Sequence, residues 1–233
     1  MKLKFKQLPK FTAFLMEFRK YKSMPGGASA SWKDLFPILN ERTSTTSFDT
    51  HYFYQDIWAF RKILESGVKA HVDVGSKVDY IGFLSTITDV TFIDIRPLVT
   101  DLPELHSRAG SILNMPYAND SVHSLSCLHV AEHIGLGRYG DPLDPLGTEK
   151  SCGELKRVLA TGGSLYFGLP IRRPTTCLNA HRVHSTGQIL DYFKGLHLAE
   201  FSLVDDKGRF HQDVSPERAK DEKYGCGLFH FRK

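Results

Sequence analysis

Short apolar runs alternate with stretches of helical periodicity through the middle of the chain. The runs are rich in β-branched residues and cover residues 70–74, 90–95, 122–127 and 164–169. Apolar runs of about four to eight residues, separated by segments of helical period, are typical of βαβ units that build a parallel sheet. The pattern predicts an α/β fold with a doubly wound, mostly parallel sheet, which binds a nucleotide-like ligand at the carboxyl ends of its strands.

The same patterns predict the remaining elements. Helical periodicity marks residues 57–66, 80–87, 148–159 and 185–194. Further strands are expected at residues 108–113 and 197–204. The last apolar run, residues 225–231, is expected to pair antiparallel at the edge of the sheet. Polar composition predicts loops at residues 172–184 and 208–221.

The first part of the chain stands apart from this pattern. Residues 1–67 are expected to form a helical extension or lid, and residues 68–233 the α/β domain. Between residues 11 and 21, apolar side chains recur at helical spacing among Lys and Arg residues, which predicts a basic amphipathic helix. Such a helix either lies on an anionic membrane surface or packs against the domain or a partner subunit, as in a homodimer.

Composition and charge exclude several classes of protein. With 41% apolar and 24% charged residues and a net charge of +4, the chain is ordinary for a globular protein. No dense run of Lys or Arg follows the first twenty residues, so nucleic acid is not an expected partner. The four cysteines form no C-x-x-C pair and are expected as reduced thiols. No signal-peptide core or run of about 18 apolar residues occurs, which predicts a soluble, cytoplasmic protein, with the inner face of the membrane as an alternative place.

Five motifs stand in the order known from one enzyme family. They are the end of the first strand at residues 72–76, the acid Asp94 ending the second, residues 110–123 before the fourth strand, Glu132-His133 after it, and residues 154–163 before the fifth. Together they resemble class I S-adenosylmethionine-dependent methyltransferases over about residues 70–170. The resemblance implies a Rossmann-like fold and methyl transfer.

The resemblance also implies S-adenosyl-L-methionine as the cofactor. In the family a glycine turn lets the backbone approach the methionine part beside a helix N-terminus, and the acid ending the second strand accepts both ribose hydroxyls. The residues implied to hold the cofactor are Asp73, Gly75, Ser76, Asp94, Ile95, Ser111, Ile112 and His129.

The chain departs from the family pattern in two places. Where the family has G-x-G-x-G, it keeps the first glycine, and Lys77 and Asp79 occupy the other two positions. Ser111 replaces the acid that bonds the adenine amino group. A side chain at residue 77 or 79 either crowds the cofactor or, as Lys77, pairs with its carboxylate.

Nearly the whole chain also resembles an uncharacterised family of methyltransferase-like proteins. Its marks here are residues 129–141 and 179–185. Bacterial members tend to accompany genes of surface-polysaccharide synthesis, which by analogy implies a sugar or glycolipid acceptor.

Residues after the fourth and fifth strands face the transferred methyl group in this fold. His133 and His181 are the candidate general bases, because a neutral imidazole can take a hydroxyl proton near pH 7. Asp141 is a further candidate catalytic residue. The residues expected to contact the acceptor are Tyr52, Tyr54, Arg138, Tyr139 and Arg182.

Metal chemistry is an alternative for the same stretch. His129, Glu132 and His133 spell the H-x-x-E-H of inverted zinc proteases, a motif that needs a helix and a third ligand. A divalent ion held by Glu132 and His133 in an O-methyltransferase is a second reading, and no metal ligand is assigned.

Three hypotheses therefore follow from the sequence. The first is a methyltransferase acting on oxygen of a small or carbohydrate acceptor. The second is a scaffold in glycan synthesis whose altered glycine turn no longer binds cofactor, and the third is a transferase that uses a nucleotide sugar.

Overall fold

The computed structural model describes residues 7–233, which form two compact units. The division falls between Phe48 and Asp49 rather than after Gly67, where the sequence led us to expect it. Helix α2 (Thr50–Ser66) belongs to the second unit, because Trp58 and Ile63 are buried in the core of that unit.

The first unit is small and helical. It holds helix α1 (Leu8–Ser23) and two short 3₁₀ turns, η2 (Gly27–Ser29) and η3 (Trp32–Asp34). The predicted helix is confirmed, and Phe18 packs edge-to-face on Trp32 with ring centres 4.5 Å apart. No side chain of α1 is buried within the described residues. The basic residues that precede Gln7 lie outside the described part.

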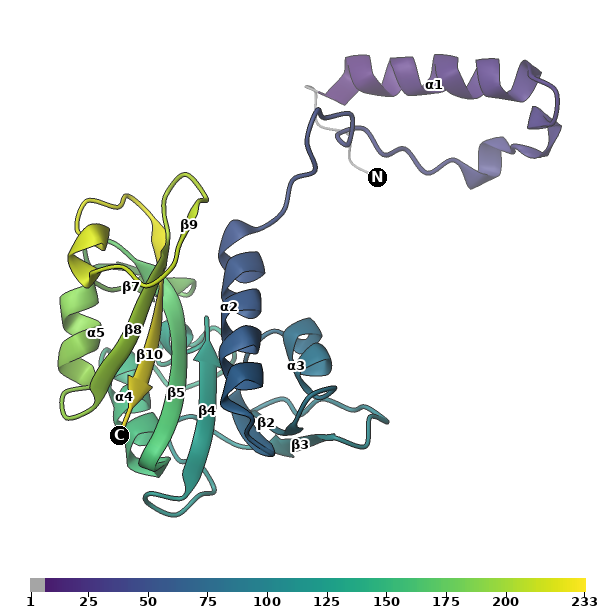
Figure 1. The fold of residues 1–233 in the computed structure, drawn as a ribbon. Helices are drawn as coiled ribbons and strands as arrows, with labels where there is room; N and C mark the ends of the chain where they lie inside the picture. Colours follow the sequence, from purple (N-terminus) through teal and green to yellow (C-terminus); the bar gives the residue numbers. More distant parts are fainter. Residues whose placement is uncertain (1–6) are drawn as a thin grey trace. The chain divides into compact units, whose positions relative to one another are not determined.

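The second unit is built on one mixed sheet of eight strands (Figure 1). Their order is β3-β2-β1-β4-β5-β10-β8-β9. The bounds are β1 Ala70–Val74, β2 Asp89–Asp94, β3 Leu105–Ala109, β4 Val122–Leu128, β5 Leu159–Ile171, β8 His197–Val204, β9 Phe210–His211 and β10 Gly225–Arg232. Strands β1 to β5 pair parallel with one another, so the predicted doubly wound, mostly parallel α/β sheet is confirmed.

Two strand predictions and two loop predictions need correction. Strand β10 is antiparallel, as expected, but it lies between β5 and β8 rather than at the edge, where the two-residue β9 stands instead. Strand β3 covers Leu105–Ala109, whereas the sequence predicted a strand at residues 108–113. The predicted loop at residues 172–184 contains the hairpin β6 (Thr175–Cys177) and β7 (His181–Val183). The loop at residues 208–221 contains β9 and the 3₁₀ turn η5 (Pro216–Ala219).

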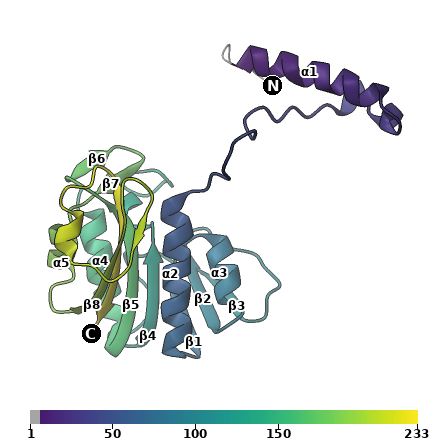
Figure 2. The ribbon, with the colours of Figure 1, turned by 45° about the horizontal axis from the view of Figure 1, so that its top comes forward.

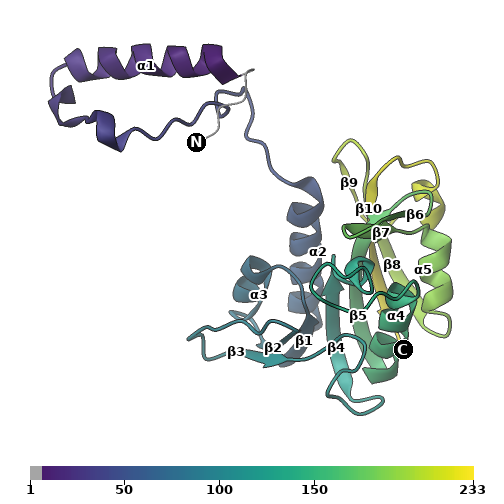
Figure 3. The same ribbon diagram turned by 180° about the vertical axis from the view of Figure 1, so that it is seen from behind.

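Helices cover both faces of the sheet. Helix α2 and α3 (Val78–Leu84) pack through Trp58, Ile63 and Leu84 on one face. Figure 2 shows α2 lying along the strands, and Figure 3 shows α4 and α5 from the opposite side. Helices α4 (Gly147–Val158) and α5 (Thr186–Tyr192) bury Leu155 and Ile189 in the other core cluster.

Helix α2 begins earlier than its periodicity predicts. Asp49 caps it by accepting hydrogen bonds from the backbone N–H groups of His51 and Tyr52, at 3.0 and 3.3 Å, and Gly67 ends it with φ +64°. Residues 50–56, which lie before the predicted helix, therefore form its first two turns. This brings the start of α2 to the carboxyl edge of the sheet (Figure 1).

Helix length and hydropathy bear on the membrane question. Over residues 7–233, no helix combines the length and the apolar character that crossing a bilayer requires.

Candidate functional site

Two neighbouring cavities lie at the carboxyl ends of the parallel strands. The first has a volume of about 450 Å³ and the second about 340 Å³. Gly75, His129, His133 and Tyr139 line both of them. In open α/β sheets this edge is where ligands bind, because the loops that follow the strands converge there.

The turn after β1 is held by a buried carboxylate. Asp73 accepts hydrogen bonds from the Ser76 N–H group at 3.0 Å, from the Ser76 hydroxyl at 2.7 Å and from the Ser126 hydroxyl. The Ser76 hydroxyl oxygen also accepts from the Leu128 N–H group at 3.1 Å. Burial raises the pKa of Asp73 to about 7, against the opposing effect of these hydrogen bonds. Asp73 thus braces the turn against β4 and lines neither cavity.

Gly75 brings the backbone close to the end of β2. Its φ is +65°, and a Cβ atom there would lie 3.1 Å from Val130 Cγ1 and 3.5 Å from Asp94 Oδ2. A side chain at this position would therefore be strained and would fill the space between the two strand ends. The Oδ1 atom of Asp94 accepts a hydrogen bond from the Arg96 N–H group at 2.7 Å, which fixes the carboxylate at the cavity wall.

The second cavity gathers most of the residues expected to hold a cofactor. They are Gly75, Asp94, Ile95, Ser111, Ile112 and His129. Ser76 lies at the first cavity instead. Ser111 uses its hydroxyl to accept the Leu113 N–H group at 3.1 Å, so it shapes the turn after β3.

The altered glycine turn puts one new side chain at a cavity. Lys77 lines the first cavity and forms an ion pair with Asp79 at 3.2 Å. Asp79 lines neither cavity. Residue 77 has φ −63°, which any residue adopts, so the backbone here requires no glycine.

Four histidines line the first cavity: His51, His129, His133 and His181. His129 follows β4 with φ +55°, and its Nδ1 atom lies 2.5 Å from Gln55 Oε1 of α2. An amide oxygen only accepts, so Nδ1 carries the proton and Nε2 is left as the acceptor atom. Burial lowers the pKa of His129 to about 3, which keeps the ring neutral at pH 7.

His133 is oriented by the loop before β7. Its Nδ1 atom donates to the Ala180 carbonyl oxygen at 2.7 Å, so Nε2 carries the free lone pair. Burial lowers the pKa of His133 to about 4. The ring centre of His181 lies 6.4 Å from that of His133. Burial, and to a smaller extent the positive charges of Arg138 and Arg172, lowers the pKa of His181 as well.

Glu132 is the most unusual acid at the site. It is fully buried, and among residues 7–233 neither carboxyl oxygen has a hydrogen-bond partner. Its Oε1 atom lies 3.8 Å from Nε2 of His133. Burial raises the pKa of Glu132 to about 8, so the carboxyl group is mostly protonated at neutral pH.

The remaining predicted site residues divide into two groups. Tyr52, Arg138 and Tyr139 line the first cavity, and the Arg138 guanidinium lies 5.2 Å from the centre of the Tyr139 ring. Tyr54 and Arg182 lie elsewhere.

Their contacts explain why Tyr54 and Arg182 are not at the site. Tyr54 stacks on Phe210 at 5.4 Å and lines a different cavity along α2. Arg182 is buried and donates to the carbonyl oxygens of Ile134 and Asp144, which ties the loop after β4 to β7. We correct both residues from acceptor contacts to structural roles.

Asp141 lies at the wall of the second cavity, but its carboxylate is used within the loop. It accepts the N–H groups of Gly135 at 2.6 Å and Tyr139 at 3.2 Å. Burial works against ionisation, and these hydrogen bonds nevertheless keep the pKa of Asp141 below its ordinary value. A carboxylate held in this way shapes the loop and is a poor proton acceptor.

The H-x-x-E-H spelling does not form the helix that an inverted zinc protease needs. His129 has a left-handed backbone, and Glu132 and His133 lie in the 3₁₀ turn η4 (Ala131–His133). The two histidines are therefore not one turn apart on a helix, and the protease reading is wrong.

Four residues at or beside the site escaped the sequence analysis. His51 and Gln55 share one face of α2 at i, i+4 spacing, a signal that was hidden because the predicted helix began at residue 57. Tyr224 lines the first cavity just after a predicted loop, and Cys226 lies close to His51 and His129 because β10 lies inside the sheet. No local pattern marks the last two.

The fold and the place of the two cavities define a class of protein. The structure is similar to the N-methyltransferase NodS from Bradyrhizobium japonicum WM9, solved with S-adenosyl-L-homocysteine, with a TM-score of 0.56, 15% identity, and 94% of this chain and 97% of NodS covered. It is also similar to the 4+2 cyclase SpnF, with a TM-score of 0.54, 13% identity, and 76% and 81% of the two chains covered. The chain has the class I methyltransferase fold.

A family model also matches about half of the chain. The model described as "Caenorhabditis protein of unknown function, DUF268" matches residues 103–223, and the chain belongs to that family. No curated protein sequence matches the chain. The matched segment contains β4, the loop with Glu132 and His133, and the β6–β7 hairpin, but it ends before β10.

Proposed function

We propose that this protein is an S-adenosylmethionine-dependent methyltransferase that acts on oxygen of a small or carbohydrate acceptor. The observation that carries the proposal is the convergence of Gly75, Asp94 and Ile112 on the second cavity, beside the first cavity, which histidines line. One cavity suits a nucleoside and the other a polar acceptor.

The chain's own residues fit the cofactor. Asp94 has a carboxylate at the cavity wall that can accept two hydroxyl hydrogen bonds, as a ribose requires. Gly75 leaves the backbone open beside it, and Ile112 supplies an apolar wall for a base. The bound cofactor would supply an electrophilic methyl group.

The acceptor would bind in the histidine-lined cavity. Nε2 of His133 would take the proton of an acceptor hydroxyl as its oxygen bonds to the methyl carbon and the carbon–sulfur bond breaks. His181 is the second candidate for this base, because it lines the same cavity and is less deeply buried than His133. Arg138 would hold an anionic or hydroxylated group of the acceptor.

A non-methylating protein is the second candidate. It is favoured by Lys77, which stands at the cavity where the methyltransferase pattern has glycine. The similarity to a cyclase is consistent with this candidate, because one fold can support more than one chemistry.

Calorimetry separates the two candidates. Titration of the purified chain with S-adenosylmethionine and S-adenosylhomocysteine is expected to give micromolar binding. Asp94→Ala should weaken it by about 10- to 100-fold, since a hydrogen bond to a charged group contributes about 1.5–3 kcal/mol.

The control is Asp101→Ala, which removes an exposed carboxylate in the loop between β2 and β3 and should leave the affinity unchanged. Absence of binding by either ligand to the folded protein would reject the methyltransferase and leave the scaffold or a different nucleotide.

A further inference from the structure

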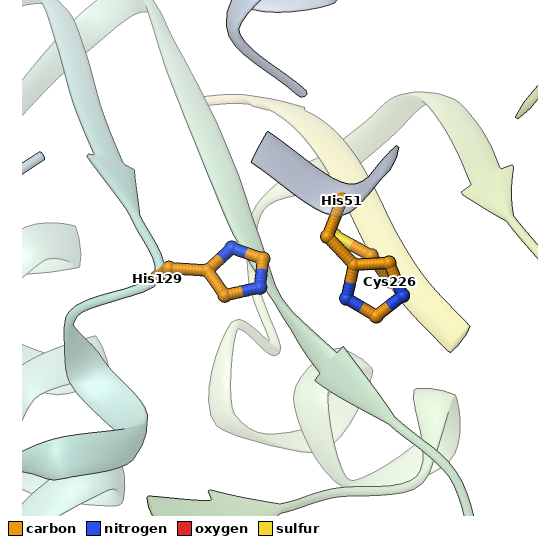
Figure 4. Close-up of side chains that lie close together, drawn as sticks. All are labelled: His51, His129 and Cys226. Carbon is orange, nitrogen blue, oxygen red and sulfur yellow. The ribbon is translucent and has the colours of Figure 1, made fainter. Parts of the chain in front are cut away.

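Three potential metal ligands lie close together beside the first cavity, and two of them, His51 and His129, line it. They are His51 near the start of α2, His129 directly after β4, and Cys226 in β10. One ligand atom of each, a ring nitrogen or the sulfur, lies within 4.8 Å of the other two. Figure 4 shows the ring of His129 pointing toward the other two side chains.

This donor set has the chemistry of a zinc site. Imidazole and thiolate are the ligands that Zn²⁺ prefers, with Zn–N distances of about 2.0–2.1 Å and Zn–S of about 2.3 Å. In tetrahedral geometry these lengths put ligand atoms roughly 3.3–3.6 Å apart. The side chains would therefore need to close by about 1 Å, which small rotations about their χ angles allow.

The surroundings orient the ligands as a metal site requires. Gln55 accepts a hydrogen bond from Nδ1 of His129, so Nε2 is the atom left to bind. A ligand histidine typically donates its second nitrogen to such an acceptor.

A buried acid also lines this cavity. The fully buried carboxyl group of Glu132 lines this cavity, and neither of its oxygens has a hydrogen-bond partner among residues 7–233. A buried polar group without a partner is rare and points to a ligand that completes the site.

We propose that His51, His129 and Cys226 bind a single Zn²⁺ ion. Both imidazoles line the first cavity, so the fourth coordination position opens into it. Three protein ligands with one open position are the arrangement of catalytic rather than structural zinc. A hydroxyl or thiol of the acceptor would bind at that position, and the metal would favour its deprotonated form.

The test uses the full chain, first stripped with a chelator and then titrated with Zn²⁺ and, separately, Co²⁺. We expect one equivalent of metal per chain by mass spectrometry, and a thiolate-to-cobalt charge-transfer band with the visible spectrum of a tetrahedral site. Gln55→Ala should weaken binding by about 10- to 100-fold, and His51→Ala and His129→Ala by more than that.

Cys226→Ser should abolish the charge-transfer band. Its matched control is Cys152→Ser, which changes an equally buried cysteine of α4 in the core cluster on the other face of the sheet. Circular dichroism reports whether each variant folds, and the spectrum of the unmodified protein tests the proposal even if Cys226→Ser does not.

Less than one equivalent of bound metal, a cobalt spectrum without the charge-transfer band, or unchanged affinity in folded His51→Ala would overturn the zinc site. None of these results depends on binding of S-adenosylmethionine, so the metal site and the proposed methyl transfer stand or fall separately.

Discussion

At the residue scale, the turn after β1, which borders the second cavity, depends on a series of buried, hydrogen-bonded side chains. Both ring nitrogens of His71 contact serine hydroxyls, Ser124 at 2.7 Å and Ser126 at 2.8 Å, and Ser126 in turn donates to Asp73. Burial lowers the pKa of His71 to about 3, so its ring stays neutral. These hydrogen bonds link β1 to β4 at the point where the turn leaves the sheet. They also give partners to polar side chains that would otherwise be costly to bury.

The raised pKa of Asp73 predicts a pH dependence of stability. The carboxyl group titrates near 7 in the folded protein and near 3.9 in the unfolded chain. Between these values the folded state binds more protons than the unfolded chain. The contribution of Asp73 to the free energy of unfolding is therefore fully present below about pH 4, and it falls by up to about 4 kcal/mol as the pH rises to 7. Asp73→Asn should flatten this decline, as measured by urea unfolding at several pH values.

The comparison for this experiment is Asp89→Asn, an exposed carboxylate at the start of β2, which should leave the decline in place. An equal slope in Asp73→Asn and the parent would mean that Asp73 is ionised in the folded protein at neutral pH.

At the element scale, short helices depend on their caps. Helix α5 has seven residues, too few to be stable alone, and it opens with a capping box. The Ser185 hydroxyl accepts the Gln188 N–H group at 3.2 Å, and the Gln188 side chain accepts the Ser185 N–H group at 3.0 Å. Ile189 then packs into the core.

Ser185→Ala is therefore expected to lower stability by about 1 kcal/mol, the usual cost of a lost N-cap. For a unit of this size the melting temperature should fall by about 2–4 °C in calorimetry. Ser185→Thr keeps a hydroxyl acceptor and should lose less. Ligand affinity should not change, because Ser185 lines neither cavity. A melting temperature equal to that of the parent would show that packing alone holds α5.

At the scale of the whole molecule, the α/β unit contains its own core. Both buried clusters and the side chains packed on them fall between Tyr54 and Phe231. The residues that line the two cavities fall between Asp49 and Tyr224. We therefore expect residues 49–233 to fold and to bind ligands by themselves. For that first unit, with its basic helix α1, we propose contact with an anionic membrane surface or with a second copy of the chain.

Deletion of residues 1–48 tests this division. The remaining chain should unfold cooperatively, and its affinity for S-adenosylhomocysteine should match that of the full chain. Sedimentation with vesicles rich in anionic lipid should be seen with the full chain and lost in the truncated one. Loss of cooperative unfolding on truncation would contradict the division, and equal sedimentation of both chains would reject the membrane contact.

Much of the fold could be predicted because its signals are local. Strand β8 at His197–Val204 and helix α4 were predicted within one residue of their ends, since side-chain periodicity depends on neighbours in the chain. The turn at Gly75 and the acid Asp94 stand at the ends of strands whose apolar pattern is clear, and the resemblance to a known family marked both residues.

Only the tertiary structure decided which distant residues meet. Cys226 belongs to a strand that the sequence placed at the edge, and it reaches His51 and His129 because β10 inserts between β5 and β8. The sequence predicted that Arg182 contacts the acceptor, yet its guanidinium donates hydrogen bonds to carbonyl groups of the loop after β4. Periodicity determines which face of an element is buried, whereas the order of strands and the course of loops determine what that face meets, and those depend on packing across the whole chain.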